Sequence, residues 1–174
     1  MNFKSLWFAG GALPLAVLAT AALAQQSGGC EAEMLQDPPR TVLTCPNDVR
    51  IVAEEGTIFE LQDRTSAAGP EAVRLDVKAL LLEAPAGAVE GGFEVITPQA
   101  VAAVRGTKWA VDVAEGKTSV FVVTGRVAVS REATAPGVEL GPGEGVDVEA
   151  GTAPLTVRKW GAARVAALLA RFGE

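Results

Sequence analysis

A two-residue alternation of apolar and polar side chains between residues 41 and 150 restricts the fold of this 174-residue chain more than any other feature. Valine is the commonest apolar residue in this region, and glycines or glycine–proline pairs divide the region into short segments. Such segments are typical of half-buried β-strands joined by turns, and no helical pattern separates them. We therefore predict an all-β fold: a compact β-sandwich or roll, or a short solenoid-like domain of glycine-punctuated strands, with a C-terminal amphipathic helix.

The longest predicted strand covers residues 73–82. Its alternation is expected to place five apolar side chains on one face: Val73, Leu75, Val77, Ala79 and Leu81. Leu80, Leu81 and Leu82 are consecutive, so we expect both faces of this end of the strand to be covered. The apolar run at residues 119–123 predicts a central strand.

The apolar pattern changes at residue 157, where an alanine-rich segment begins. Val165, Leu168, Leu169 and Phe172 fall on one stripe of a helix, so we predict a helix over residues 157–174. This segment has a net charge of +3, whereas residues 25–156 carry −10. We expect the helix to dock on the acidic β-domain, with Trp160 as its anchor. Binding to a membrane surface is the alternative.

The N-terminus has the pattern of a signal peptide. Lys4 precedes an apolar run over residues 6–23, and Ala22-Leu23-Ala24 matches the small residues that signal peptidase reads. We expect cleavage after Ala24, which makes residues 1–24 a signal peptide and the mature protein periplasmic. An uncleaved membrane anchor is the alternative, because the run approaches the length that spans a bilayer. After cleavage we expect no stable membrane insertion.

The chain has two cysteines, Cys30 and Cys45. An even number of cysteines in an exported chain predicts a structural disulfide. Pro38-Pro39 lies between them and disfavours regular structure, so residues 25–48 are interpreted as an irregular arm that the disulfide pins to the first strand. The predicted β-domain then covers residues 49–156.

Composition excludes several function classes. The chain has no histidine, so no histidine-based catalytic triad or zinc protease site exists. A net charge of −6 argues against a nucleic-acid partner. No sequence pattern indicates a metal or cofactor, and the sequence predicts no catalytic residue. Carboxylates beside the turn at residues 141–145, Glu144 among them, leave a glycan-acting enzyme as a lower-ranked alternative. We interpret that turn as a hairpin rather than a phosphate-binding loop.

Arg105 stands between Val104 and Gly106, just before a strand that begins with Thr107. A buried arginine needs partners for its donors, so the favoured interpretation is a partly buried side chain tied to backbone carbonyls or to an acid. The alternative is an exposed arginine that recognises a partner.

Three stretches together resemble the FecR domain family. Residues 98–113 contain Val104-Arg105-Gly106-Thr107 and then Trp109, residues 118–129 form two valine strands around Gly125, and residues 140–146 end the pattern. The resemblance covers about residues 93–150. It maps the family core motif, with a structural or recognition role, onto four residues: Arg105, Gly106, Thr107 and Trp109.

The resemblance implies an all-β periplasmic domain used in signalling. In full-length members a cytoplasmic anti-sigma segment and a transmembrane helix precede this domain, and a following domain contacts an outer-membrane, TonB-dependent receptor. The chain looks like a short form without the anti-sigma segment. We therefore expect a non-catalytic module for protein interaction, scaffolding or envelope sensing, with one or more unidentified envelope proteins as partners. A membrane-tethered regulator that keeps residues 1–24 is the alternative.

Overall fold

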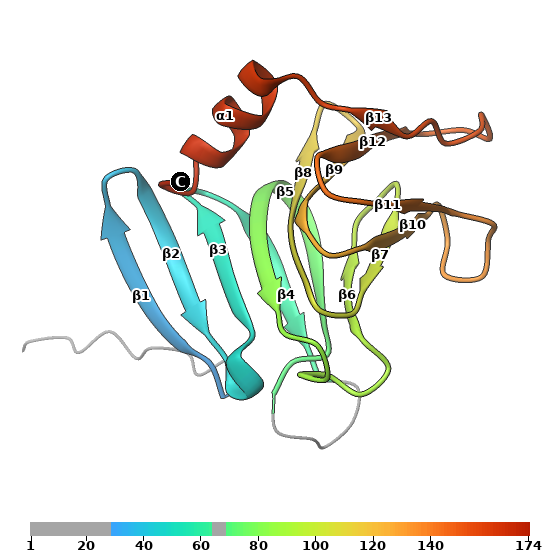
Figure 1. The fold of residues 1–174 in the computed structure, drawn as a ribbon. Helices are drawn as coiled ribbons and strands as arrows, with labels where there is room; N and C mark the ends of the chain where they lie inside the picture. The colour runs from blue at the N-terminus through green and yellow to red at the C-terminus, as the bar shows by residue number, and fades with distance from the viewer. Residues whose placement is uncertain (1–28, 64–68) are drawn as a thin grey trace, which may run out of the picture.

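The computed structural model describes residues 29–63 and 69–174, and it confirms the all-β prediction. In this part of the chain, strands form one mixed sheet that curls into two layers, and a single short α-helix lies near the C-terminus (Figure 1). The predicted signal peptide, residues 1–24, lies outside the described residues.

The first layer, here called the first sheet, has the strand order β1-β2-β3-β5-β8-β9-β12-β13. Its strands are β1 (Glu31–Gln36), β2 (Pro39–Thr44), β3 (Arg50–Glu54), the second half of β5 (Ala72–Ala84), β8 (Thr107–Ala114), β9 (Lys117–Thr124), β12 (Glu144–Glu149) and β13 (Arg158–Lys159). The predicted central strand is confirmed, because β9 lies between β8 and β12.

The second sheet has the order β4-β5-β6-β7-β10-β11. It consists of β4 (Ile58–Gln62), the first half of β5, β6 (Phe93–Ile96), β7 (Val101–Val104), β10 (Val127–Ser130) and β11 (Val138–Leu140). The β5–β6 pair is parallel, and the other described pairs are antiparallel. The main apolar core lies between the two sheets and contains side chains from both.

Strand β5 belongs to both sheets and bends where it passes between them. Lys78 has a positive φ of 67°, and its Nζ donates a hydrogen bond to the carbonyl oxygen of Glu55. Before the bend Val73 and Leu75 face the main core, and after it Leu80 and Leu82 do so. The predicted single apolar face is therefore wrong. An irregular residue in a strand resets the alternation of the residues that follow, as a β-bulge does.

Leu81 and Ala79 face away from the main core and join a second apolar cluster. This cluster lies between the first sheet and helix α1 (Ala162–Ala170), whose Leu168 is buried there together with Phe172. The expectation that Leu80 to Leu82 would be covered on both faces is confirmed. The predicted docking of the C-terminal segment on the β-domain is confirmed as well.

Helix α1 is shorter than the predicted helix over residues 157–174, because Arg158 and Lys159 pair with β12 as strand β13. Trp160 follows that strand and stacks on Phe121, with ring centroids 5.0 Å apart. The guanidinium of Arg164 lies over the Trp160 ring, 3.4 Å from its centroid. Trp160 therefore anchors the segment just before the helix begins.

Ion pairs add to the docking of the helix. Arg171 donates hydrogen bonds to the carboxylates of Glu54 and Asp112, and its bond to Glu54 raises the pKa of the guanidinium. Arg164 pairs with Asp147 at 2.6 Å. Burial acts to raise the pKa of the Asp147 carboxyl, but hydrogen bonds from Arg164 and Ser119 outweigh it, so this pKa lies below its ordinary value. The basic segment and the acidic β-domain are thus joined by specific pairs.

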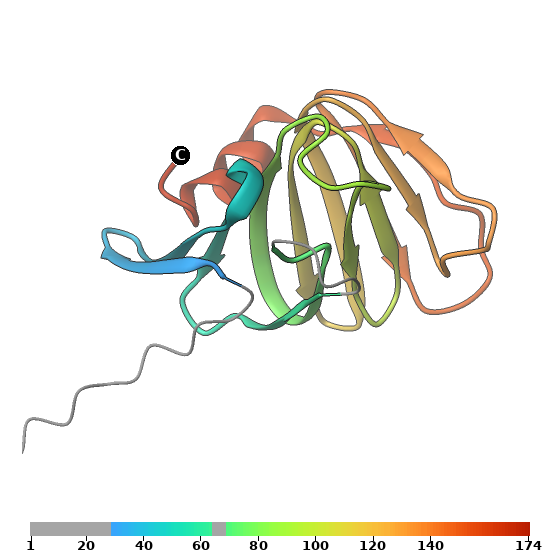
Figure 2. The same ribbon diagram turned by 90° about the horizontal axis from the view of Figure 1, so that it is seen from below.

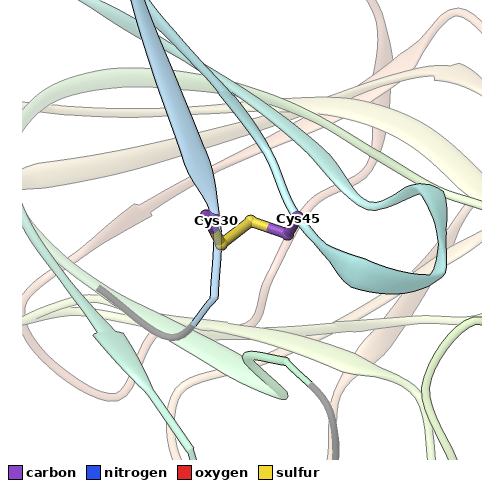
Figure 3. The surroundings of a disulfide bond; sticks show 2 residues. All are labelled: Cys30 and Cys45. Carbon is purple, nitrogen blue, oxygen red and sulfur yellow. A yellow bond between two sulfur atoms is a disulfide. The ribbon is translucent and has the colours of Figure 1, made fainter. Parts of the chain in front are cut away.

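The region between the cysteines is more regular than expected. Cys30 and Cys45 form the predicted disulfide, with an S–S distance of 2.02 Å (Figure 3). Strands β1 and β2 form an antiparallel hairpin between them, so the prediction of an irregular arm is wrong for this stretch. Pro39 is the first residue of β2, a position where a missing N–H is tolerated. Figure 2 shows the hairpin extending from the main body of strands.

Candidate interaction site at the Arg105 turn

The family core motif spans the turn between β7 and β8 and the start of β8. Gly106 has a φ of +71°, and a Cβ at this position would lie 2.9 Å from the Cβ of Ala86. Only glycine satisfies both conditions without a shift of the neighbouring chain. Gly106 therefore has a structural role, because it lets this turn approach the segment that follows β5.

Thr107 joins this turn to the one between β9 and β10. Its side chain is buried, and Oγ1 donates a hydrogen bond of 2.9 Å to the carbonyl oxygen of Arg126. Gly125, in the turn between β9 and β10, packs against Gly106, since a Cβ on Gly125 would come within 2.4 Å of the carbonyl oxygen of Gly106. The two turns are therefore locked together at one end of the sheets.

Trp109 points into the main core and is fully buried. Its ring meets that of Phe93 edge to face, with centroids 6.2 Å apart. Its Nε1 is buried without a hydrogen-bond partner among the described residues. The position of Trp109 indicates a role in packing.

Arg105 differs from the other three motif residues because its side chain is exposed. The favoured interpretation, a partly buried arginine tied to nearby carbonyls or an acid, is wrong: Arg105 has no hydrogen bond or ion pair with the described residues. Arg105 instead lines a cavity of about 450 Å³.

The loop between β5 and β6, residues 85–92, forms the other wall of this cavity. Two turns shape the loop, with hydrogen bonds from Ala88 N to Pro85 O and from Gly92 N to Val89 O, both 3.1 Å long. The lining residues are Ala84, Pro85, Gly87, Val89, Glu90, Gly91, Gly92, Phe93, Val104, Arg105 and Gly106. Sequence reasoning missed the contribution of this loop, because Gly91-Gly92 indicated a turn but not which motif it would face.

The acidic residues considered for glycan chemistry are engaged elsewhere. Glu144 accepts a hydrogen bond of 2.8 Å from Gly141 N, within its own turn. The prediction that this turn forms a hairpin is wrong, because β11 belongs to the second sheet and β12 to the first. Asp147 pairs with Arg164, and Glu139 pairs with Arg126. These contacts do not place two of these carboxylates across a common cleft.

The described part of the chain, residues 29–63 and 69–174, holds no group of three or more side chains of the metal-ligating types close enough to bind one ion. None of its helices has both the length and the apolar content needed to cross a bilayer.

Comparison with known proteins supports the resemblance found in the motif. Residues 43–128 match the family model described as "FecR protein". No curated protein sequence matches the chain. The matched range both begins and ends earlier than the predicted region of resemblance, residues 93–150, so the stretch at residues 140–146 lies outside it. The range includes all four residues of the core motif, Arg105 to Thr107 and Trp109.

Two solved structures share the fold. Both are crystal structures of a putative anti-sigma factor from Parabacteroides distasonis ATCC 8503, at 2.50 and 1.65 Å resolution. The first is 19% identical with a TM-score of 0.60, and the alignment covers 80% of this chain and 64% of that one. The second is 20% identical with a TM-score of 0.57, covering 82% and 62%. This chain thus spans less than two thirds of the length of these structures. Residues 43–128 of its β-domain region belong to the FecR family.

Proposed function

We propose that the chain is an exported, periplasmic FecR-domain module that works by binding another envelope protein, without catalysis, as a sensing or scaffolding part of a signalling system. Its membership of a family with regulatory members and the fold it shares with a putative anti-sigma factor support a role in signalling. The disulfide between Cys30 and Cys45 supports export to an oxidising compartment.

The exposed side chain of Arg105 is the observation that carries this proposal. Three of the four motif residues are accounted for by packing and turn geometry, namely Gly106, Thr107 and Trp109. Arg105 adds nothing comparable to the fold, since it makes no hydrogen bond or ion pair with the described residues and lies beside a cavity. An unpaired arginine at the rim of a cavity is suited to contact a partner.

We also propose the division of the chain that the sequence indicates: a signal peptide over residues 1–24, a disulfide-pinned segment over 25–48, the FecR β-domain over 49–156 and a docking segment over 157–174. Strands β2 and β3 pair across the second boundary, and α1 packs on the first sheet. The mature segments would therefore fold as one unit.

Affinity capture of envelope proteins, identified by mass spectrometry, tests the binding function. We expect a partner that binds the wild type and is lost in Arg105→Ala. The matched control is Arg126→Ala, which removes an equal charge from an exposed side chain on the neighbouring turn, where it pairs with exposed Glu139. Circular dichroism and thermal unfolding verify that both variants fold. A partner captured equally by wild type and Arg105→Ala would refute the role of Arg105.

The mass of the protein isolated from the periplasmic fraction tests export. Cleavage after Ala24 leaves a chain that begins at Gln25. An intact N-terminus in the membrane fraction would replace this proposal with the membrane-tethered regulator.

A further inference from the structure

Two residues of opposite charge line the cavity beside the Arg105 turn, and their side chains do not pair with each other. Arg105 comes from the turn between β7 and β8, and Glu90 comes from the loop between β5 and β6. Both are exposed, and neither forms a hydrogen bond or ion pair with the described residues. Elsewhere in this molecule nearby opposite charges do pair, as Arg171 does with Glu54. A cavity that keeps one positive and one negative group apart suits a ligand that carries both charges.

The floor of the cavity is apolar. Phe93 and Val104 are buried core residues that reach its lining, and Val89 packs against the same core from the loop. Its volume of about 450 Å³ lies within the range of about 300–1,000 Å³ for small-molecule sites. The charged groups would therefore bind the ends of a ligand whose apolar side chain rests on this floor.

Two close backbone approaches hold the walls in place. A Cβ on Gly92 would lie 2.5 Å from the carbonyl oxygen of Val104, and a Cβ on Gly106 would meet Ala86 at 2.9 Å. The loop and the turn are thus in contact at two points on either side of Arg105. A site fixed before the ligand arrives binds at a lower entropic cost than one that must be ordered.

From this arrangement we propose that the cavity binds a short peptide that has free amino and carboxyl termini and an apolar side chain. The carboxylate pairs with the guanidinium of Arg105, the ammonium group pairs with the carboxylate of Glu90, and the apolar side chain packs on Phe93 and Val104. A free apolar amino acid has the same three groups and is a second source of this chemistry. The proposal rests on the proposed function, because it makes this peptide the signal that the module senses at the Arg105 site.

Isothermal titration of the purified chain, with its disulfide intact, tests the proposal with leucyl-leucine as the probe. N-acetyl-leucyl-leucine removes the ammonium charge, and leucyl-leucine amide removes the carboxylate. Hydrogen bonds between charged groups contribute enough that each modification should weaken binding about tenfold or more. Free leucine is titrated in parallel. Tighter binding of the dipeptide identifies a peptide ligand, and tighter binding of leucine identifies an amino acid.

The variants assign each charge to its residue. In Arg105→Ala we expect the acid and the amide to bind equally weakly, while the loss caused by acetylation persists. In Glu90→Gln we expect the free and the acetylated dipeptides to bind equally weakly, while the loss caused by amidation of the carboxylate persists. Arg126→Ala, the control for a change in net charge, should bind like the wild type. Because Arg105 and Glu90 are exposed, neither substitution is expected to unfold the chain, and circular dichroism verifies this.

Equal affinities for the free and blocked dipeptides would overturn the proposal, as would no binding of leucyl-leucine or leucine at millimolar concentration. This failure is distinguishable from failure of the proposed function. Arg105-dependent capture of an envelope protein with no peptide binding would reject the peptide ligand alone. Peptide binding with no captured partner would reject the protein-binding function and keep the cavity site.

Discussion

Charged side chains are paired on the face covered by α1 but unpaired among the described residues at the cavity that Arg105 lines. On the covered face, Arg171 lies between Glu54 and Asp112, and Arg164 pairs with Asp147. At the other site, Arg105 and Glu90 share a cavity and have no partner among the described residues. Matched charges on a buried apolar surface hold the fold together, whereas unmatched charges around an apolar floor are available to a ligand. The contrast makes different predictions for substitutions in the two regions.

The largest effect is expected for Phe172→Ala on the covered face. Phe172 is buried in the second apolar cluster, and truncation would leave a cavity between the chain end and the first sheet. We expect the free energy of unfolding to fall by about 3 kcal/mol, measured by denaturant titration. A loss below about 1 kcal/mol would mean that the C-terminal segment contributes little to the folded state.

Arg171→Met should have the next largest effect. It retains an apolar side chain but leaves Glu54 and Asp112 without their shared cation. Removing one partner from a largely buried ion pair is costly, but these groups retain partial solvent access, so we expect a loss of about 2 kcal/mol in denaturant titration. Arg171→Lys should recover part of this loss. If lysine and methionine have equal effects, the charge contacts do not stabilise the docking.

Acidification should weaken the same face through Asp147. Its pKa in the folded chain lies below the ordinary value of 3.8, so the carboxylate stabilises the fold above that pH. The contribution disappears as the pH falls from 3.8 through the folded-state pKa. Because the pair is partly exposed, we expect less than about 1 kcal/mol, measured as the difference between wild type and Asp147→Asn at pH 7 and pH 3. A difference that grows on acidification would contradict this assignment.

Arg105→Ala should have the smallest effect on stability. An exposed side chain without partners can be truncated with a change of about 0.5 kcal/mol or less in the free energy of unfolding. The same substitution should weaken the binding of leucyl-leucine to the cavity about tenfold or more. A loss of 2 kcal/mol in thermal or denaturant unfolding would instead show that Arg105 belongs with Arg171 as a structural residue.

The sequence predicted most strands of the β-domain, the disulfide and the docking of the basic segment, because each depends on local patterns or on simple charge and redox arguments. It did not predict the hairpin of β1 and β2. It failed at Lys78, where a non-glycine residue takes a positive φ and reverses the apolar face of β5. A strand pattern contains no signal for such an irregularity. The predicted helix was too long for a related reason: Arg158 and Lys159 pair with β12, and only the tertiary fold provides that partner.

Only part of the candidate site could be predicted from the sequence. Arg105 stood out among apolar neighbours, but those neighbours led to the prediction of a partly buried side chain. Its exposure depends on where Gly106 directs the chain. Glu90 could not be connected with it, because the two residues come to line one cavity only through the close approaches of Gly92 to Val104 and of Gly106 to Ala86. Contacts between distant loops depend on the whole fold, which a single sequence does not reveal.

The passage of β5 through both sheets has a consequence for unfolding. Its first half pairs with β4 and β6, and its second half pairs with β3 and β8, so neither layer can lose β5 without disturbing the other. The β-domain should therefore open cooperatively. We expect the slowest-exchanging amides of β6 and β8 to share one protection free energy, equal to that of global unfolding.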